Sequence, residues 1–128
     1  MEGELAAGNA EAALELAYRE LVGLTHQELA DVRAQPSWPS RVAAAHTIPR
    51  EERAFASTAF EREQAAAITV PTLLLVGTES PAWGSEAQIV AGALPDARIV
   101  HLDGQGHIAD LVAPEAVTEA LLPFILGR

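Results

Sequence analysis

Cysteine is absent from the 128 residues, so disulfide bonds, thiolate metal ligands and a cysteine nucleophile are excluded. Cationic residues are scarce: 8 Lys and Arg stand against 18 Asp and Glu, and the formal net charge is -10. An acidic field of this size repels nucleic acids and anionic membrane surfaces. We therefore expect neither as a partner, whereas small neutral or apolar substrates remain open.

Long hydrophobic runs are missing as well. The longest apolar stretch lies around Ala65 to Val76, where Thr69, Pro71 and Thr72 interrupt it, and it is too short to cross a bilayer. No basic segment followed by an apolar core opens the chain. We expect a soluble, cytoplasmic protein.

A serine placed as a nucleophile is also missing. The sequence contains no Gly-x-Ser-x-Gly segment, the sharp strand-to-helix turn that exposes a catalytic serine. The serines are Ser37, Ser40, Ser57, Ser80 and Ser85. Because 128 residues are short for a complete α/β enzyme, the chain is expected to be a small domain or part of a larger one.

Two regions with different patterns are present, 1–67 and 68–128. The first predicts short helices that form a lid-like segment, and the second predicts alternating strands and helices. Expected helix signals in the first region are a cap at Asn9, a stop at Gly23, a capping box at Thr25 to Glu28 and a stop at Pro36. Further helices are expected at Pro39 to His46 and Pro49 to Phe60.

The second region predicts one β-α-β unit and a closing helix. The expected order is a strand at Thr72–Val76, a helix near Trp83–Leu94, a strand at Arg98–Leu102 and a helix at Pro114–Leu126. The run Leu-Leu-Leu-Val in the first strand lacks polar alternation, as expected of a parallel strand covered on both faces. Since the crossover is right-handed, the turns after both strands are expected at one edge of the sheet.

Those two turns carry an acid and a histidine. Glu79 lies in the turn after the first strand, and His107 ends the segment Gly104-Gln105-Gly106-His107 after the second. A carboxylate that accepts from one ring nitrogen fixes the tautomer and leaves the other nitrogen free as a base. We expect these two side chains to be catalytic, although turn residues without a role are the alternative for each.

Other residues fit less specific roles. Trp38, Phe55 and Phe60 are candidates for lining a pocket beneath the lid or for the core. The histidines share no metal-ligand spacing, so we expect no metal and no cofactor. Gly104-x-Gly106-x-x-Ala109 also matches a dinucleotide-binding motif after a strand, but that motif needs a long following helix and a further strand.

In order and spacing these segments resemble the α/β-hydrolase superfamily. The strand that leads to the acid turn of that family is similar to Ile68-Thr69-Val70-Pro71-Thr72-Leu73-Leu74-Leu75-Val76-Gly77. The approach to the family's histidine is similar to Leu94-Pro95-Asp96-Ala97-Arg98 followed by Gly104-Gln105-Gly106-His107. The helical first region resembles the cap that precedes the acid strand. The resemblance implies a partial α/β-hydrolase fold: a helical cap segment, then a parallel β-α-β unit and a C-terminal helix.

Two departures limit what the resemblance implies. The family's acid is most often an aspartate three residues after the glycine, and this chain has Ser80 at that position. The resemblance therefore assigns the acid to Glu79, which lies one residue earlier. The nucleophile elbow and the oxyanion-hole segment are absent. The chain resembles the C-terminal, truncated half of a hydrolase for an ester, amide or similar small substrate, inactive alone, and whether it is itself an enzyme stays open.

An unpaired strand edge would remain where upstream strands are missing. We therefore expect a homo-oligomer, or a partner chain that carries the nucleophile half. A non-catalytic association module is the alternative function that the same edge supports.

Overall fold

The computed structural model describes residues 1–58 and 60–127. The chain divides into two compact units, 1–59 and 60–128. This division precedes the boundary near residue 67 that the sequence pattern predicts, because α6 (Arg62–Ala66) belongs to the second unit. There the Arg62 guanidinium donates to the carbonyl oxygen of Gly92 at 3.1 Å. None of the helices within the described ranges has the length and apolar character needed to cross a membrane.

The first unit contains helices joined by turns, and no strand occurs in its described residues. Its elements are α1 (Glu2–Ala6), α2 (Ala10–Ala17), a π-helical turn (Tyr18–Val22), α3 (His26–Arg33), α4 (Trp38–Ala44), a 3₁₀ turn (Ala45–Thr47) and α5 (Ile48–Ala56). The capping box at the start of α3 is formed as expected: Glu28 N–H donates to Thr25 Oγ1 at 3.2 Å, and Thr25 N–H donates to Glu28 Oε2 at 2.8 Å. Gly23 ends the preceding helix with a φ of 79°.

The core of this unit is built from small and medium apolar side chains around one tryptophan. Trp38 is buried, its indole N–H donates to Glu11 Oε1 at 2.9 Å, and its ring stacks on Tyr18 with centroids 6.3 Å apart. The other buried residues of the unit are Ala13, Leu14, Ala17, Leu24, Leu29, Val32 and Ala45. Trp38 therefore serves the core, and its polar atom is satisfied there.

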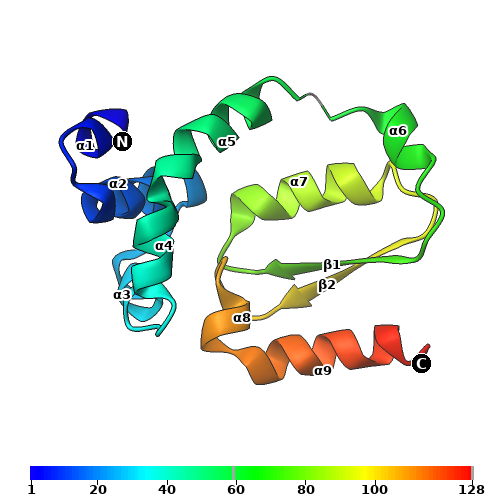
Figure 1. Ribbon diagram of the computed structural model, residues 1–128. Coiled ribbons are helices and arrows are strands. Elements are labelled where there is room, and N and C mark those ends of the chain that lie inside the picture. Colours follow the sequence, from blue (N-terminus) through cyan, green and yellow to red (C-terminus); the bar gives the residue numbers. More distant parts are fainter. Residues whose placement is uncertain (59, 128) are drawn as a thin grey trace. The chain divides into compact units, whose positions relative to one another are not determined.

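The second unit contains the β-α-β unit that the sequence predicts. Its elements after α6 are β1 (Thr72–Gly77), α7 (Pro81–Ala91), β2 (Ala97–Leu102), α8 (Ala109–Val112) and α9 (Pro114–Ile125). The two strands pair in parallel, from Thr72 opposite Ala97 to Gly77 opposite Leu102. Figure 1 shows α7 on one face of this sheet and α9 on the other, and both helices contact both strands.

The turns after the two strands are joined by three hydrogen bonds. Thr78 N–H donates to Leu102 O at 3.1 Å, and Gly104 N–H donates to Thr78 Oγ1 at 2.8 Å. Glu79 N–H donates to Gln105 O at 2.9 Å. We call this set the turn clasp. It holds the segment with Glu79 against the segment that leads to His107.

Gly77 permits the close approach that the turn clasp requires. A Cβ atom at this position would lie 2.2 Å from Gln105 O and 2.6 Å from Gly106 O, distances that real Cβ contacts do not reach. Because both atoms belong to the backbone, they cannot move aside without displacing the His107 turn. Glycine is therefore required at the end of β1 for a packing reason.

Gly77→Ala is expected to lower the free energy of unfolding by about 1–3 kcal/mol, the usual cost of forcing extra volume into a packed site. Gly84→Ala is the matched control, because a Cβ there meets only Val76 Cγ1 at 3.7 Å and the position lies inside α7. That change should raise stability by about 0.5–1 kcal/mol. Urea denaturation of both variants measures the difference, and equal stability of Gly77→Ala and the parent chain would contradict the packing role.

Candidate active site

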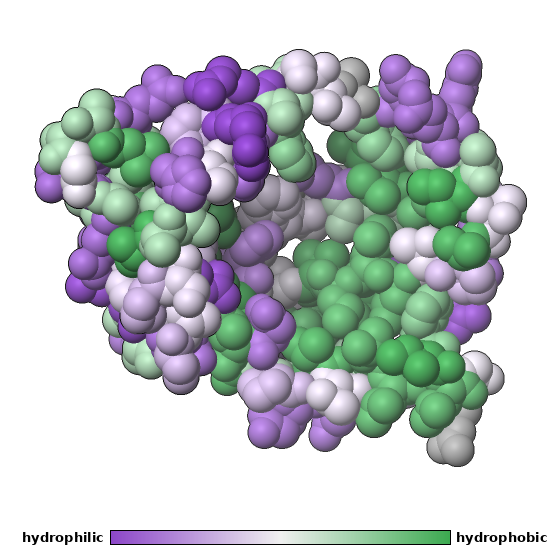
Figure 2. Space-filling view, viewed as in Figure 1, coloured by the Kyte–Doolittle hydropathy of each residue, from purple (hydrophilic) through white to green (hydrophobic). Residues whose placement is uncertain are grey.

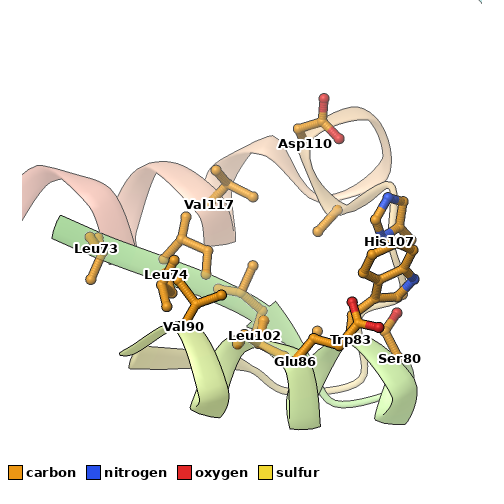
Figure 3. A pocket seen from close by; sticks show the side chains of 16 residues that line it. Leu73, Leu74, Ser80, Trp83, Glu86, Val90, Leu102, His107, Asp110 and Val117 are labelled. Atoms are coloured by element: carbon orange, nitrogen blue, oxygen red, sulfur yellow. The ribbon is translucent and has the colours of Figure 1, made fainter. Parts of the chain in front are cut away.

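His107 lies in the turn between β2 and α8, and its side chain is exposed. Its imidazole packs on the indole of Trp83, with ring centroids 4.9 Å apart and planes at 33°. Figure 3 shows both rings together at one end of a pocket. The contact limits the orientations that are open to the imidazole.

Trp83 is a site residue that the sequence analysis did not single out. It lies in the first turn of α7, which begins at Pro81 directly after the acid turn. Side chains on a helix lean toward its N-terminus, so an aromatic residue in this turn reaches the sheet edge where the strands end. Its position two residues after the helix start was the signal that could have identified it.

The pocket beside His107 has a volume of about 480 Å³. It extends along β1, with side chains of α7 and α9 on either side of the strand (Figure 3). The polar side chains that line it lie toward the His107 end: Ser80, Glu86 and Asp110. The rest of the pocket lining is mainly apolar. The polar side chains that could take part in a reaction therefore lie at the His107 end of the pocket.

Glu79 reaches the His107 turn through its backbone. Its N–H is part of the turn clasp, but within the described residues no hydrogen bond or ion pair joins its carboxylate to the imidazole. Glu79 does not line the pocket, whereas Glu86 and Asp110 do, also without a hydrogen bond to His107. The structure thus brings the two turns together and leaves the carboxylate and the imidazole unpaired.

The aromatic candidates for pocket lining lie elsewhere. Trp38 is part of the first unit's core, Phe55 is 82% exposed and Phe60 is 50% exposed. None of the three lines the pocket at His107 or a second pocket of about 290 Å³ in the first unit. In that second pocket Arg41 Nη1 donates to the Tyr18 hydroxyl at 2.8 Å.

The structure does not favour the dinucleotide alternative. The helix that follows Gly104-x-Gly106-x-x-Ala109 is α8, which is only four residues long and is followed at once by α9. The amide of Gly104 is already used by Thr78, and no further strand follows within the described residues. No group of three or more acidic or histidine side chains that could hold a metal ion occurs in those residues either.

Comparison with known proteins gives one informative relative. No protein-family model matches the chain, and no curated protein does. Among solved structures, the chain is similar to an alpha/beta hydrolase from Sphaerobacter thermophilus DSM 20745, with 34% sequence identity and a TM-score of 0.75. The match covers 97% of this chain and 48% of that chain, so this chain spans about half the length of the solved hydrolase.

This similarity agrees with the order of elements. A helical segment is followed by a parallel β-α-β unit and a further helix, the arrangement that the sequence predicts. The chain therefore has a partial α/β-hydrolase fold, matching about half of a solved member of that superfamily.

Proposed function

We propose that this chain supplies the histidine and the acid of a Ser-His-acid triad in an α/β-hydrolase that cleaves a small ester or amide. His107 is the general base and Glu79 orients it. The observation that carries the proposal is the turn clasp, because Glu79 N–H bonds to Gln105 O only two residues before His107. Two turns held this closely place both residues at the same edge of the sheet, where ligands bind in open parallel sheets.

The chemistry assigned to His107 is proton transfer. One ring nitrogen takes the proton of a serine hydroxyl as that oxygen attacks the carbonyl carbon, and then gives the proton to the leaving group. The acid accepts a hydrogen bond from the other nitrogen. The nucleophile and the oxyanion-hole donors come from outside these 128 residues, since no serine here stands in a Gly-x-Ser-x-Gly turn.

The pocket favours substrates without negative charge. Trp83 offers an apolar surface beside the imidazole, while Glu86 and Asp110 line the same pocket. Two carboxylates in one pocket repel an anionic substrate and tolerate a neutral one. The net charge of -10 acts in the same direction.

Glu79 is the preferred acid, and Asp110 is its competitor. Glu79 follows β1 in a turn that is bonded to the His107 turn, and its side chain has several rotamers open to it there. Asp110 lies on α8, in the same short segment as His107, and its orientation follows that helix. Substituting Glu79 and Asp110 one at a time shows which of the two carboxylates orients the imidazole.

A chimera tests the proposal directly. The part of the Sphaerobacter thermophilus hydrolase that the match leaves uncovered is joined to residues 1–128 and assayed on an activated phenyl ester. His107→Ala should lower kcat by about 10⁶-fold and Glu79→Gln by about 10⁴-fold, the scales seen when a triad loses its base or its acid. Asp110→Asn, the matched control, should change kcat by less than about tenfold.

The unfused chain is the second control. A histidine and an acid without a nucleophile and an oxyanion hole give only weak general-base help, so its turnover should not exceed that of buffer. Ser80 shares the pocket with His107, and turnover by the unfused chain that Ser80→Ala abolishes would refute an external nucleophile. A chimera whose kcat falls with Asp110→Asn but not with Glu79→Gln would assign the acid to Asp110.

The Trp83 contact can be followed by fluorescence. A Trp38→Phe background leaves Trp83 as the one tryptophan, since the sequence contains two. Its emission maximum should shift to longer wavelength in His107→Ala, because the indole face that the imidazole covers becomes exposed to water. It should stay unchanged in His101→Ala, a matched change at an exposed position of β2. Equal emission of the parent chain and His107→Ala would contradict the contact.

A further inference from the structure

The second pocket, of about 290 Å³, lies entirely within the first unit. Its walls come from α2, the π-helical turn, α4, the 3₁₀ turn and the start of α5. The lining is mainly apolar, and its larger aliphatic side chains are Leu14, Leu21, Val22 and Ile48. Pockets for drug-sized ligands measure about 300–1,000 Å³, so this one suits a smaller molecule with an apolar body.

The surface beside this pocket is polar. Figure 2 shows strongly hydrophilic side chains gathered over α5, whose place is labelled in Figure 1. This helix carries the consecutive charged residues Arg50, Glu51, Glu52 and Arg53, of which Glu52 lines the pocket. An apolar molecule therefore finds in the pocket the cover that the charged side of α5 does not offer.

The polar end of the pocket is a guanidinium held in place by two hydroxyl groups. Arg41 Nη1 donates to the Tyr18 hydroxyl at 2.8 Å, and Arg41 Nε donates to Ser37 Oγ at 3.2 Å. Arg41 is half-buried, and within the described residues no carboxylate forms an ion pair with it. A cation that is fixed by neutral partners in an apolar pocket favours an anionic ligand.

Arg41 and Tyr18 both keep hydrogen-bond donors for a ligand. A guanidinium has more N–H groups than the two bonds to Tyr18 and Ser37 use. The Tyr18 oxygen accepts from Arg41, and in the part of the chain that the structure describes its own hydrogen is not donated to any group. Two donors on atoms 2.8 Å apart match the two oxygens of a carboxylate.

The π-helical turn Tyr18–Val22 brings three of its residues to the pocket: Tyr18, Leu21 and Val22. At its end Gly23 N–H donates to Tyr18 O, one residue further back than in an α-helix. Wide turns of this kind are rare and occur frequently at functional sites. The backbone irregularity and the arginine without a carboxylate partner therefore occur at the same place.

We propose that this pocket, which we call the Arg41 pocket, binds a monocarboxylate with a short apolar chain. The carboxylate accepts from Arg41 and Tyr18, and the chain lies against Leu14 and Ile48. Glu52 weakens this binding without preventing it, because its side chain is exposed and solvated whereas Arg41 is held. Ester hydrolysis releases carboxylates of this class, but the binding rests on the first unit alone and not on the proposed function.

Titration of residues 1–128 with sodium hexanoate, in a buffer free of other carboxylates, tests the proposal. Proton–nitrogen correlation spectra should show saturable shifts at Leu14, Leu21 and Ile48 and none at His107. Hexanoate should bind about tenfold more tightly than butanoate, because two further methylene groups leave water. Hexylamine, which has the same chain and the opposite charge, should bind more weakly than hexanoate.

Matched variants identify the groups that hold the carboxylate. Arg41→Gln should weaken hexanoate binding by about 10–100-fold, because a charge-assisted hydrogen bond is lost. Arg19→Gln makes the same charge change at an exposed residue that does not line the pocket, and it should have little effect. Tyr18→Phe keeps the ring that stacks on Trp38 and should weaken binding by about fivefold.

Glu52→Gln gives an effect of the opposite sign. It should strengthen hexanoate binding by about twofold to fivefold, because a like charge leaves the pocket. Glu51→Gln is the control, an exposed neighbour on the same helix that does not line the pocket. If Arg41→Gln fails to fold, Tyr18→Phe and Glu52→Gln still decide whether the carboxylate lies at this site.

Three results would overturn the proposal. They are equal hexanoate binding by the parent chain and Arg41→Gln, tighter binding of hexylamine than of hexanoate, and shifts at the pocket that do not saturate. Because the titration requires no turnover, an inactive chimera would contradict the triad and leave the Arg41 pocket standing. Absence of hexanoate binding would in turn leave the triad untouched.

Discussion

The hydrogen bonds between the turn after β1 and the turn after β2 are the constraint on which the geometry of the candidate site depends. Parallel pairing brings both turns to one edge of the sheet, and the turn clasp fixes their distance. The approach is possible because Gly77 has no Cβ to strike Gln105 O. The segments that carry Glu79 and His107 are far apart in the sequence and are thereby held in one small region, as the proposed catalysis requires.

The same two-strand sheet is incomplete as a folding unit. A sheet usually needs about three or more strands, or a covering helix layer, for independent stability. Here the helix layers are present, while in the described residues the outer edges of both β1 and β2 are unpaired. The helices α7 and α9 cover the two faces of the sheet. The chain spans about half the length of the solved hydrolase that it matches, which agrees with the small size of this sheet.

The strands and their end turns could be predicted from the sequence, because an unbroken apolar run such as Leu73 to Val76 is typical of a strand in a parallel sheet. Helix starts with a local signal, such as Thr25 with Glu28, were also predictable. The Trp83–His107 contact was not, because it joins residues that are distant in the sequence. No local signal predicted the π-helical turn at Tyr18–Val22 either. Asn9 shows the limit of local rules: it stands at the start of α2, yet its side chain donates to Glu4 instead of capping.

The measurement that tests the central claim most directly is the proton NMR signal of the His107 ring N–H in the chimera that contains the nucleophile half. A ring N–H bound to a carboxylate gives a resonance far downfield and exchanges slowly with water. The account predicts this signal in the parent chimera and in Asp110→Asn, and its loss in Glu79→Gln. A signal that survives in Glu79→Gln would contradict the account, because the turn clasp would then position some other acid.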